Sequence, residues 1–359
     1  MDLLLTSEQE QLRAAARAFL ASHGAPSADR APGCDPASWL RSCRELGLAG
    51  LLAAGEWGGS DAGLREAALV MQEGGAVLDT SPLLSTSLAM AALRAVGETA
   101  GGAWVADAVD GRRRVALLLA TRADRDTIVL TAASEKGPAR VDARVSGVLD
   151  AVDADFFVVL GALADGRPGV GLVDADEPGV RRDPLSGLDL TRSFARVEIT
   201  GAAAHVEAVS PPVMDDIRSR LDTLVAAELV GVIRHCVEAL GAYVNTRVAF
   251  GRTIGSYQGV KHQLADMYCT FELADTAVRA AAAAIDDSEP DAALEAAVAL
   301  HKATNSALDV TAESLRLYGG IGYTWEHDAH LYFRRARVDA VLLGRPEAQA
   351  RRLAALLSV

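Results

Sequence analysis

The chain has 359 residues, half of them hydrophobic, and a formal net charge of −13 at pH 7. This length suffices for two or three domains or for one large composite subunit. The acidic balance, without any stripe of basic residues, argues against binding to nucleic acid or to an anionic membrane surface.

The cysteines and the first residues favour a cytoplasmic protein. Cys34, Cys43, Cys236 and Cys269 are scattered and lack the spacing of metal ligands, which is typical of reduced thiols. No apolar run has the length of a transmembrane helix, and residues 1–6 lack the basic start of a signal peptide. We therefore expect a cytoplasmic chain that holds no metal and does not contact a membrane.

Residues 1–110 are predicted to form a helical domain. Apolar and aromatic side chains recur there at helical intervals. Ser7 and Glu10 have the spacing of a capping box at the start of the first helix. The sequence EWGG at residues 56–59 predicts a turn before a later helix.

Residues 111–206 are predicted to form a small β-domain. Short apolar runs are separated there by Gly, Pro and Asp, which is typical of strands joined by turns. The predicted strands cover residues 115–120, 127–132, 156–160, 170–173 and 194–199.

Residues 207–359 are predicted to be helical again. Pro212 suits the entry to a helix that runs to about Arg247. A second helix is expected from about residue 257 to 285, and a third from about 291 to 317. The expected fold class is α+β and mostly α: an N-terminal helical domain, a middle β-domain and a C-terminal four-helix bundle.

The link between the first two long helices, RVAFGRTIGSYQG, is the most informative segment. Arg247 offers a rigid fork of donors suited to a phosphate, and Phe250 offers an aromatic face. Gly251 and Gly255 let the backbone turn sharply, and Gln258 adds an amide. The segment therefore has the residue types of a phosphate-binding link.

A second glycine turn, YGGIGYTWE at residues 318–326, ends the third helix. In order and spacing, this turn and the link that begins at Arg247 resemble the acyl-CoA dehydrogenase family, and so does the text of residues 260–267. The resemblance covers essentially the whole chain, and its most specific motifs lie in the last block.

This resemblance implies a reaction, a cofactor and partners. Members of the family bind FAD and desaturate an acyl-CoA between Cα and Cβ. A carboxylate removes the α-proton, and the β-hydrogen leaves as hydride to the flavin. The resemblance implies an acyl-CoA substrate and electron-transfer flavoprotein as the electron acceptor. The implied cofactor-binding residues are Arg247, Phe250, Gln258, Arg316, Gly319 and Gly320.

The catalytic base of the family has no counterpart in this sequence. Its usual place, set by Arg335 and Gly344, is occupied by Leu343. Other members carry the base on the first long C-terminal helix, at the place of Leu221. Leucine cannot accept a proton. Glu228 is a weak candidate, because it lies on roughly the same helix face as Leu221 but about 10 Å along the axis. We expect a structural, hydrogen-bonding role for it.

The middle block also departs from the family. The loop that holds the flavin ring corresponds to residues 121–126, which keep Thr121 but lack the family's Pro, Gly and Ser. A Trp-Ile-Thr strand beside the flavin is replaced by residues 148–151. The base and the flavin cradle are therefore both missing.

In the family the FAD lies across a subunit boundary, and this sequence keeps only the residues for the adenine and pyrophosphate end. It thus resembles the base-lacking subunit of bacterial heteromeric acyl-CoA dehydrogenases, many from steroid side-chain catabolism. We expect a subunit that completes the FAD site of a second acyl-CoA dehydrogenase subunit, within a heterotetramer. Two alternatives are a self-sufficient dehydrogenase that uses Glu228 or another base, and a flavin-free structural or regulatory partner.

Overall fold

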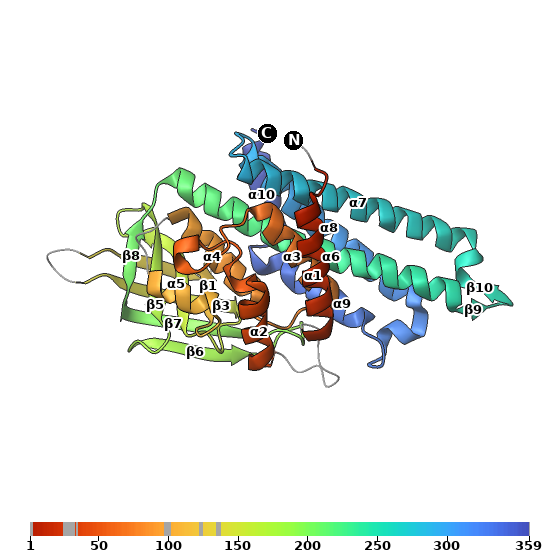
Figure 1. Ribbon diagram of the computed structural model, residues 1–359, viewed down its shortest axis with the longest axis horizontal. Coiled ribbons are helices and arrows are strands. Elements are labelled where there is room, and N and C mark those ends of the chain that lie inside the picture. Colours follow the sequence, from red (N-terminus) through yellow and green to blue (C-terminus); the bar gives the residue numbers. More distant parts are fainter. Residues whose placement is uncertain are drawn as a thin grey trace.

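The computed structural model describes residues 3–23, 33, 35–96, 102–121, 125–133 and 138–358. Helices come first, a β-sheet follows, and a bundle of long helices ends the chain (Figure 1). This order confirms the predicted fold class. The change from helix to strand falls between Val109 and Val115, and the change back falls between Ala208 and Pro211.

Where the structure describes it, the N-terminal part consists of five α-helices and two short 3-10 turns. They are α1 (Ser7–His23), α2 (Pro36–Leu46), η1 (Leu48–Gly50), η2 (Gly55–Trp57), α3 (Leu64–Val77), α4 (Leu83–Val96) and α5 (Gly102–Val109). The capping box of α1 is one residue earlier than predicted. Gln9 Oε1 accepts from the Thr6 N–H at 3.1 Å, and Thr6 Oγ1 accepts from the Gln9 N–H at 3.2 Å. The prediction of Ser7 and Glu10 was wrong because Thr6 and Gln9 have the same spacing.

The middle part is a curled eight-stranded sheet. Its strands are β1 (Val115–Leu119), β2 (Thr127–Thr131), β3 (Arg140–Leu149), β4 (Phe156–Leu163), β5 (Pro168–Asp174), β6 (Val180–Leu185), β7 (Phe194–Ala203) and β8 (His205–Ala208). The path through the sheet is β6-β7-β3-β2-β4-β5-β8, and β1 pairs with β4. All five predicted strands are present, and β3, β6 and β8 are additional. Most ladders are antiparallel, but β4 runs parallel to β1 and β2.

The two faces of the sheet belong to different cores. Along β4, Phe156 and Val158 point to the core shared with the helices, whereas Phe157 and Val159 point to a second core inside the curl of the sheet. This alternation follows from the two-residue period of a strand. Since β4 is buried on both faces, it reads in the sequence as a continuous apolar run.

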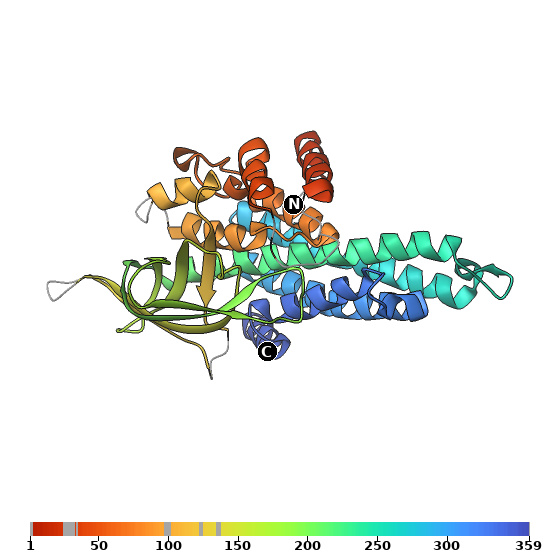
Figure 2. The ribbon, with the colours of Figure 1, turned by 90° about the horizontal axis from the view of Figure 1, so that it is seen from below.

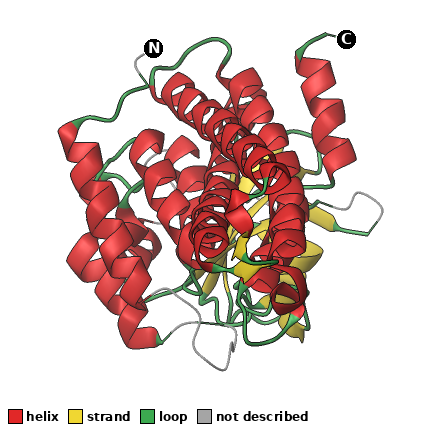
Figure 3. Ribbon diagram, turned by 90° about the vertical axis from the view of Figure 1, so that its right-hand side faces the viewer, coloured by secondary structure: helices red, strands yellow, loops and turns green. Residues whose placement is uncertain are grey.

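Long helices make up the C-terminal bundle (Figures 2 and 3). They are α6 (Pro211–Thr246), α7 (Gln258–Asp286), α8 (Ala292–Tyr318), α9 (Ala329–Leu342) and the shorter α10 (Pro346–Leu356). A small hairpin of β9 (Val248–Ala249) and β10 (Arg252–Thr253), followed by η3 (Ile254–Ser256), joins α6 to α7, and η4 (Gly319–Tyr323) leads from α8 toward α9. Among the described residues, no helix is both long enough and apolar enough to cross a bilayer.

The N-terminal part is joined to the bundle where α3 crosses α6. A Cβ added at Gly75 would lie 2.1 Å from the carbonyl oxygen of Glu228, and one added at Gly231 would lie 2.0 Å from that of Gln72. The two backbones therefore touch at this crossing, and only glycine leaves the space. This contact holds the middle of α6 against the N-terminal part.

Candidate functional site

The structure places the two glycine links at the same end of the bundle (Figure 1). Tyr243, in the last turn of α6, has its ring 4.8 Å from the ring of Tyr318, and its hydroxyl donates to the Tyr318 carbonyl at 3.4 Å. Arg247 follows one turn after Tyr243, and its N–H donates to the Tyr243 carbonyl at 2.9 Å. Gly319 follows Tyr318 directly. Two segments about seventy residues apart therefore form one surface.

The hairpin between α6 and α7 holds Phe250 away from the rest of the chain. Ala249 pairs with Arg252, so Phe250 and Gly251 form a two-residue turn, with φ angles of +53° and +80°. Such turns favour Asn-Gly, and a bulky side chain at positive φ costs on the order of 1 kcal/mol. Phe250 is nevertheless 97 % exposed. A strained, uncovered phenyl ring at a hairpin tip points to a function outside the isolated chain.

Tyr257 makes two contacts that support the hairpin. The Tyr257 hydroxyl donates to the Ala249 carbonyl at 3.1 Å, and the Arg252 guanidinium lies 3.8 Å from the centre of the Tyr257 ring. Gly255 does not turn the backbone through positive φ as expected. A Cβ there would lie 3.0 Å from the Val244 carbonyl, so this glycine allows close packing on α6.

The remaining predicted ligand residues are also exposed. Gly319 has φ +67° and ψ −146°, a region that only glycine adopts readily. A Cβ at Gly319 or Gly320 would meet no atom within 4 Å, so this backbone is open to a ligand. Arg316 pairs with Glu313 at 2.9 Å but its side chain is largely exposed, and Gln258 is the exposed first residue of α7.

At the place of the family base, the structure shows a buried leucine held by its backbone. Leu343 follows the last residue of α9, and Arg218 donates to its carbonyl oxygen. Arg218 and Arg352 both pair with Asp222, which is fully buried. Burial raises the pKa of Asp222, although the two guanidinium groups oppose that rise. Leu221 is fully buried too, so neither expected base position offers a proton acceptor.

The cavity beside Leu343 is small, and its lining mixes apolar with polar side chains. Its volume of about 40 Å³ leaves room for little more than a water molecule. Drug-sized and cofactor-sized ligands occupy cavities of roughly 300–1,000 Å³. Its polar lining comes from Ser85, Thr121 and Ser146, and its apolar lining comes from Leu88, Leu117, Leu119, Val145, Val148, Leu149, Leu342 and Leu343.

Asp126 closes the segment that corresponds to the flavin loop. Its Oδ2 accepts from the Thr121 N–H at 3.1 Å, and its Oδ1 accepts from the Ser146 N–H at 3.4 Å. The predicted flavin-loop residues 122–124 lie outside the described residues. Asp126 was not predicted from the sequence to have a role of its own, although an acidic residue that follows a short polar loop often binds backbone N–H groups.

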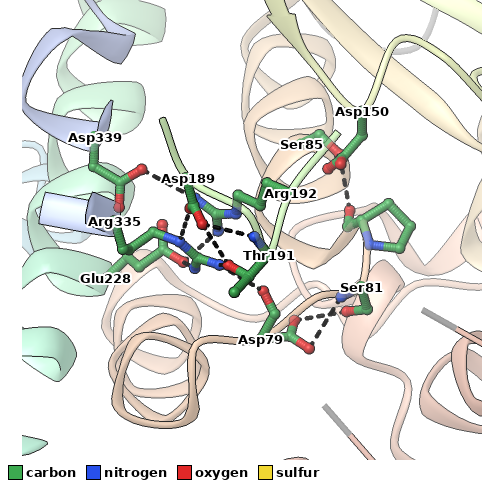
Figure 4. Close-up of polar contacts among 11 residues, drawn as sticks. Asp79, Ser81, Ser85, Asp150, Asp189, Thr191, Arg192, Glu228, Arg335 and Asp339 are labelled. Carbon is green, nitrogen blue, oxygen red and sulfur yellow. Dashed lines mark hydrogen bonds and ion pairs between the residues drawn. The ribbon is translucent and has the colours of Figure 1, made fainter. Parts of the chain in front are cut away.

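Glu228 lies in a buried ionic network and does not line the cavity beside Leu343 (Figure 4). It is 2 % exposed, and its Oε1 accepts from Arg335 Nη1 at 3.0 Å and from Arg192 Nη2. Arg335 also donates to Asp189 Oδ2 at 2.5 Å. These contacts favour the expected structural role over proton abstraction. Nothing in the local sequence indicates them, because Glu228 is 36 residues from Arg192 and 107 from Arg335.

The described residues differ in how well they suit the two ends of FAD. The exposed Arg247 and the open backbone at Gly319 and Gly320 suit a pyrophosphate group. The small cavity beside Leu343 does not suit a flavin ring.

Comparisons with known proteins identify the family. Residues 6–107 match the family profile "Acyl-CoA dehydrogenase, N-terminal domain", and residues 220–357 match "Acyl-CoA dehydrogenase, C-terminal domain". Acyl-CoA dehydrogenase IpdE2 from Mycolicibacterium smegmatis is 33 % identical over 363 residues, which cover 98 % of this chain and 99 % of that protein.

Two solved structures have the same fold over nearly their whole length. The Tcur3481-Tcur3483 steroid ACAD variant is 25 % identical with a TM-score of 0.87, and 98 % of each chain is covered. The ChsE4-ChsE5 complex from Mycobacterium tuberculosis is 24 % identical with a TM-score of 0.88, covering 100 % of this chain and 99 % of that one. Together with the profiles and the full-length relative, they show that this chain belongs to the acyl-CoA dehydrogenase family, whose members are FAD-dependent oxidoreductases.

Proposed function

We propose that this chain is the base-lacking subunit of a heteromeric, FAD-dependent acyl-CoA dehydrogenase. It completes the FAD site of a partner subunit and has no catalytic site of its own. One observation carries this proposal: the end of the bundle around Arg247 and Gly319 is exposed and open, whereas the cavity beside Leu343 is only about 40 Å³, with leucine and valine as most of its lining residues.

In this proposal the chain's own residues bind and position. Arg247 pairs with the pyrophosphate through charge-assisted hydrogen bonds, and the backbone at Gly319 and Gly320 approaches it closely. Arg316 and Gln258 lie at the same end and add polar contacts. The bound flavin supplies the hydride acceptor for α,β-desaturation, and the partner subunit supplies the carboxylate that removes the α-proton.

The exposed apolar side chains support a subunit boundary at this end of the bundle. A monomer rarely leaves many large apolar side chains together on its surface. The exposed ones on the two links are Val248, Phe250, Ile321, Tyr323 and Trp325. Beside them lies a groove of about 430 Å³, lined mainly by Leu188, Leu315, Tyr323, Trp325 and Phe333.

The partner and substrate follow from the relatives. The ChsE4-ChsE5 structure is a complex of two chains, and the Tcur3481-Tcur3483 structure is a steroid ACAD. We extend these features to this chain: a heterotetramer with a second acyl-CoA dehydrogenase subunit, acting in the cytoplasm on an acyl-CoA from lipid or steroid breakdown. Electron-transfer flavoprotein is the proposed electron acceptor.

Turnover assays test this function. This chain, a candidate partner and their mixture would each be given acyl-CoA and an artificial electron acceptor. We expect turnover only from the mixture or the co-expressed complex, because Leu343 and Leu221 cannot take a proton. Turnover by the pure chain on the order of 1 per second or more would refute the proposal.

Restoring the base alone is expected to fail. Leu343→Glu in the isolated chain places a carboxylate at the expected base position, but the cavity there is only about 40 Å³ in the unchanged chain and this single change does not create room for a flavin ring. We expect no turnover from this variant. If it turned over at the rate of an ordinary enzyme, the chain would have a working flavin site of its own.

A further inference from the structure

The charges in the buried network around Glu228 do not balance. Two guanidinium groups, Arg192 and Arg335, are in direct contact with three carboxyl groups, Asp189, Glu228 and Asp339, and all five side chains are at most 3 % exposed. An unpaired buried charge is so costly that the group usually takes up or releases a proton instead. If all three carboxyl groups were ionised, the network would hold one negative charge more than its two guanidinium groups can balance.

Glu228 on α6 and Asp339 on α9 are neighbours. Arg192 donates through Nη2 to Glu228 Oε1 and through Nη1 to Asp339 Oδ1, the latter at 3.0 Å. The two Nη atoms belong to one planar guanidinium, so the carboxyl groups that they bind lie side by side (Figure 4). The second oxygen of each group, Glu228 Oε2 and Asp339 Oδ2, is buried and has no hydrogen-bond partner within the described part of the chain.

The contacts identify which carboxyl group holds the extra proton. Asp189 accepts from Thr191 with one oxygen and from Arg335 with the other. Glu228 Oε1 accepts from both guanidinium groups, whereas Asp339 accepts from Arg192 alone. Burial, together with the charge of Glu228, raises the pKa of Asp339 well above its ordinary value, whereas the pKa of Asp189 is lowered despite its burial, because Arg335 and Arg192 outweigh it.

We propose that Asp339 carries a proton in the folded chain at neutral pH and donates it from Oδ2 to Glu228 Oε2. This single hydrogen bond pairs both orphaned oxygens. It also balances the network, with two guanidinium charges against the carboxylates of Asp189 and Glu228. The proton then links α9 to α6. Arg192, from the loop between β6 and β7, contacts both helices at this point.

The sign of the pH dependence follows from this arrangement. Because the pKa of Asp339 is higher in the folded chain, its contribution to stability is complete below the ordinary Asp pKa and is lost as pH rises through the folded value. Loss of the proton adds a third negative charge to the network, beside the carboxylates of Asp189 and Glu228. Two other carboxyl groups face the network, Asp79 and Asp150, bonded to the hydroxyls of Ser81 and Ser85.

The buried network is connected to the exposed groove through α9 and through the loop between β6 and β7. α9 carries Phe333 and Arg334, which line the groove of about 430 Å³, and Arg334 donates to the Leu188 carbonyl at 3.2 Å. Leu188 precedes Asp189 in the loop that Arg335 anchors. Deprotonation is therefore expected to loosen this groove first, and the inference holds whether or not the chain has a partner.

Infrared spectroscopy tests the proposal directly, because a protonated carboxyl group has a C=O stretch distinct from that of a carboxylate. At about pH 7.5, where an ordinary Asp is ionised, we expect one such band from a buried carboxyl group in the whole chain. It should be absent from Asp339→Asn and remain in Asp150→Asn, the matched control. Absence of the band from the unchanged chain, or its persistence in Asp339→Asn, would overturn the proposal.

Unfolding measurements provide a second test. Asn reproduces the protonated Asp in shape and donor, so Asp339→Asn should fold. Because Asn does not titrate, the variant should not lose stability as pH rises, and its denaturant midpoint at neutral pH should be higher than that of the unchanged chain. Its unfolding should release about one proton fewer than that of the unchanged chain, measured from the pH dependence of the unfolding free energy. Glu228→Gln should instead lower the midpoint, because both guanidinium groups lose their shared carboxylate. An Asp339→Asn chain that fails to fold, or is destabilised as much as Glu228→Gln, contradicts a protonated Asp339.

Discussion

At Arg247, an exposed guanidinium ends a 36-residue helix and makes no side-chain hydrogen bond or ion pair among the described residues. Replacing it with alanine should therefore leave the folding of the free chain unchanged. In the complex with a partner, Arg247→Ala should weaken FAD binding about ten- to a hundred-fold, since a charge-assisted hydrogen bond contributes about 1.5–3 kcal/mol. Flavin fluorescence during dilution of the complex would measure the loss.

The control for Arg247→Ala is an exposed arginine on the middle domain. Arg181 on β6 pairs only with Asp183 and Glu198 among the described residues, far from the two links. Arg181→Ala should leave FAD affinity unchanged. Equal FAD affinity in the Arg247→Ala and the unchanged complexes would remove the main support for a shared site.

Phe250 allows a test in which stability and function move in opposite directions. Asn tolerates positive φ, so Phe250→Asn should stabilise the free chain by about 0.5–1 kcal/mol in denaturant unfolding. It should weaken assembly with the partner, because the phenyl ring that is 97 % exposed in the free chain is lost from the boundary. Sedimentation of the mixture would measure assembly, and unimpaired assembly would show that Phe250 does not lie at the boundary.

The residues that could be predicted from the sequence are those in contiguous motifs. Arg247, Phe250 and Gly319 lie in short segments whose residue types and spacing are legible without a structure, and the structure brings those segments together. Glu228 is different, because its partners come from distant parts of the chain. Only the folded arrangement shows that its carboxylate is already engaged.

Among the elements, the long helices were predicted to within a few residues, while three strands were missed. Proline and glycine mark the helix ends, and each helix spans many turns of a regular pattern. β6 and β8 are the two ends of the sheet path and are rich in charged or polar residues, so neither forms an apolar run. β3 alternates buried and exposed residues for much of its length, a pattern that a search for apolar runs overlooks.

The junction of β3 with the N-terminal helices should depend on pH through Asp150. Ser85 donates to its Oδ2 at 2.8 Å, and burial raises its pKa from 3.8 to about 6. A raised carboxyl pKa means that stability is complete below about pH 4 and falls as pH rises through about 6. Asp150→Asn removes this loss, so the variant should gain up to about 3 kcal/mol relative to the unchanged chain between pH 4 and pH 7.5.

Denaturant unfolding of both proteins at several pH values measures this gain. Asn also suits the positive φ of residue 150, which is +53°, so the backbone should not be strained by the change. A difference in stability that stays constant across this pH range would show that Asp150 titrates normally in the folded chain.

For the whole molecule, the sequence predicts the three-part architecture and the family, because both rest on long stretches of pattern. The filling of the space beside Leu343 could be predicted only in part. Two leucines at the base positions were visible, but the cavity of about 40 Å³ depends on side chains from α4, β1, β3 and α9 meeting in space. Packing of this kind is decided by the fold as a whole.

Counting FAD tests the central claim most directly. The chain would be purified alone and with a co-expressed partner, and FAD would be measured per chain after denaturation. If this chain contributes the end around Arg247 and Gly319 to a shared site, as proposed, we predict no flavin in the chain alone and about one FAD per pair of unlike subunits in the complex. A chain that is flavin-free in every pairing would favour a structural or regulatory role. One FAD per chain in the pure protein would contradict the shared site outright.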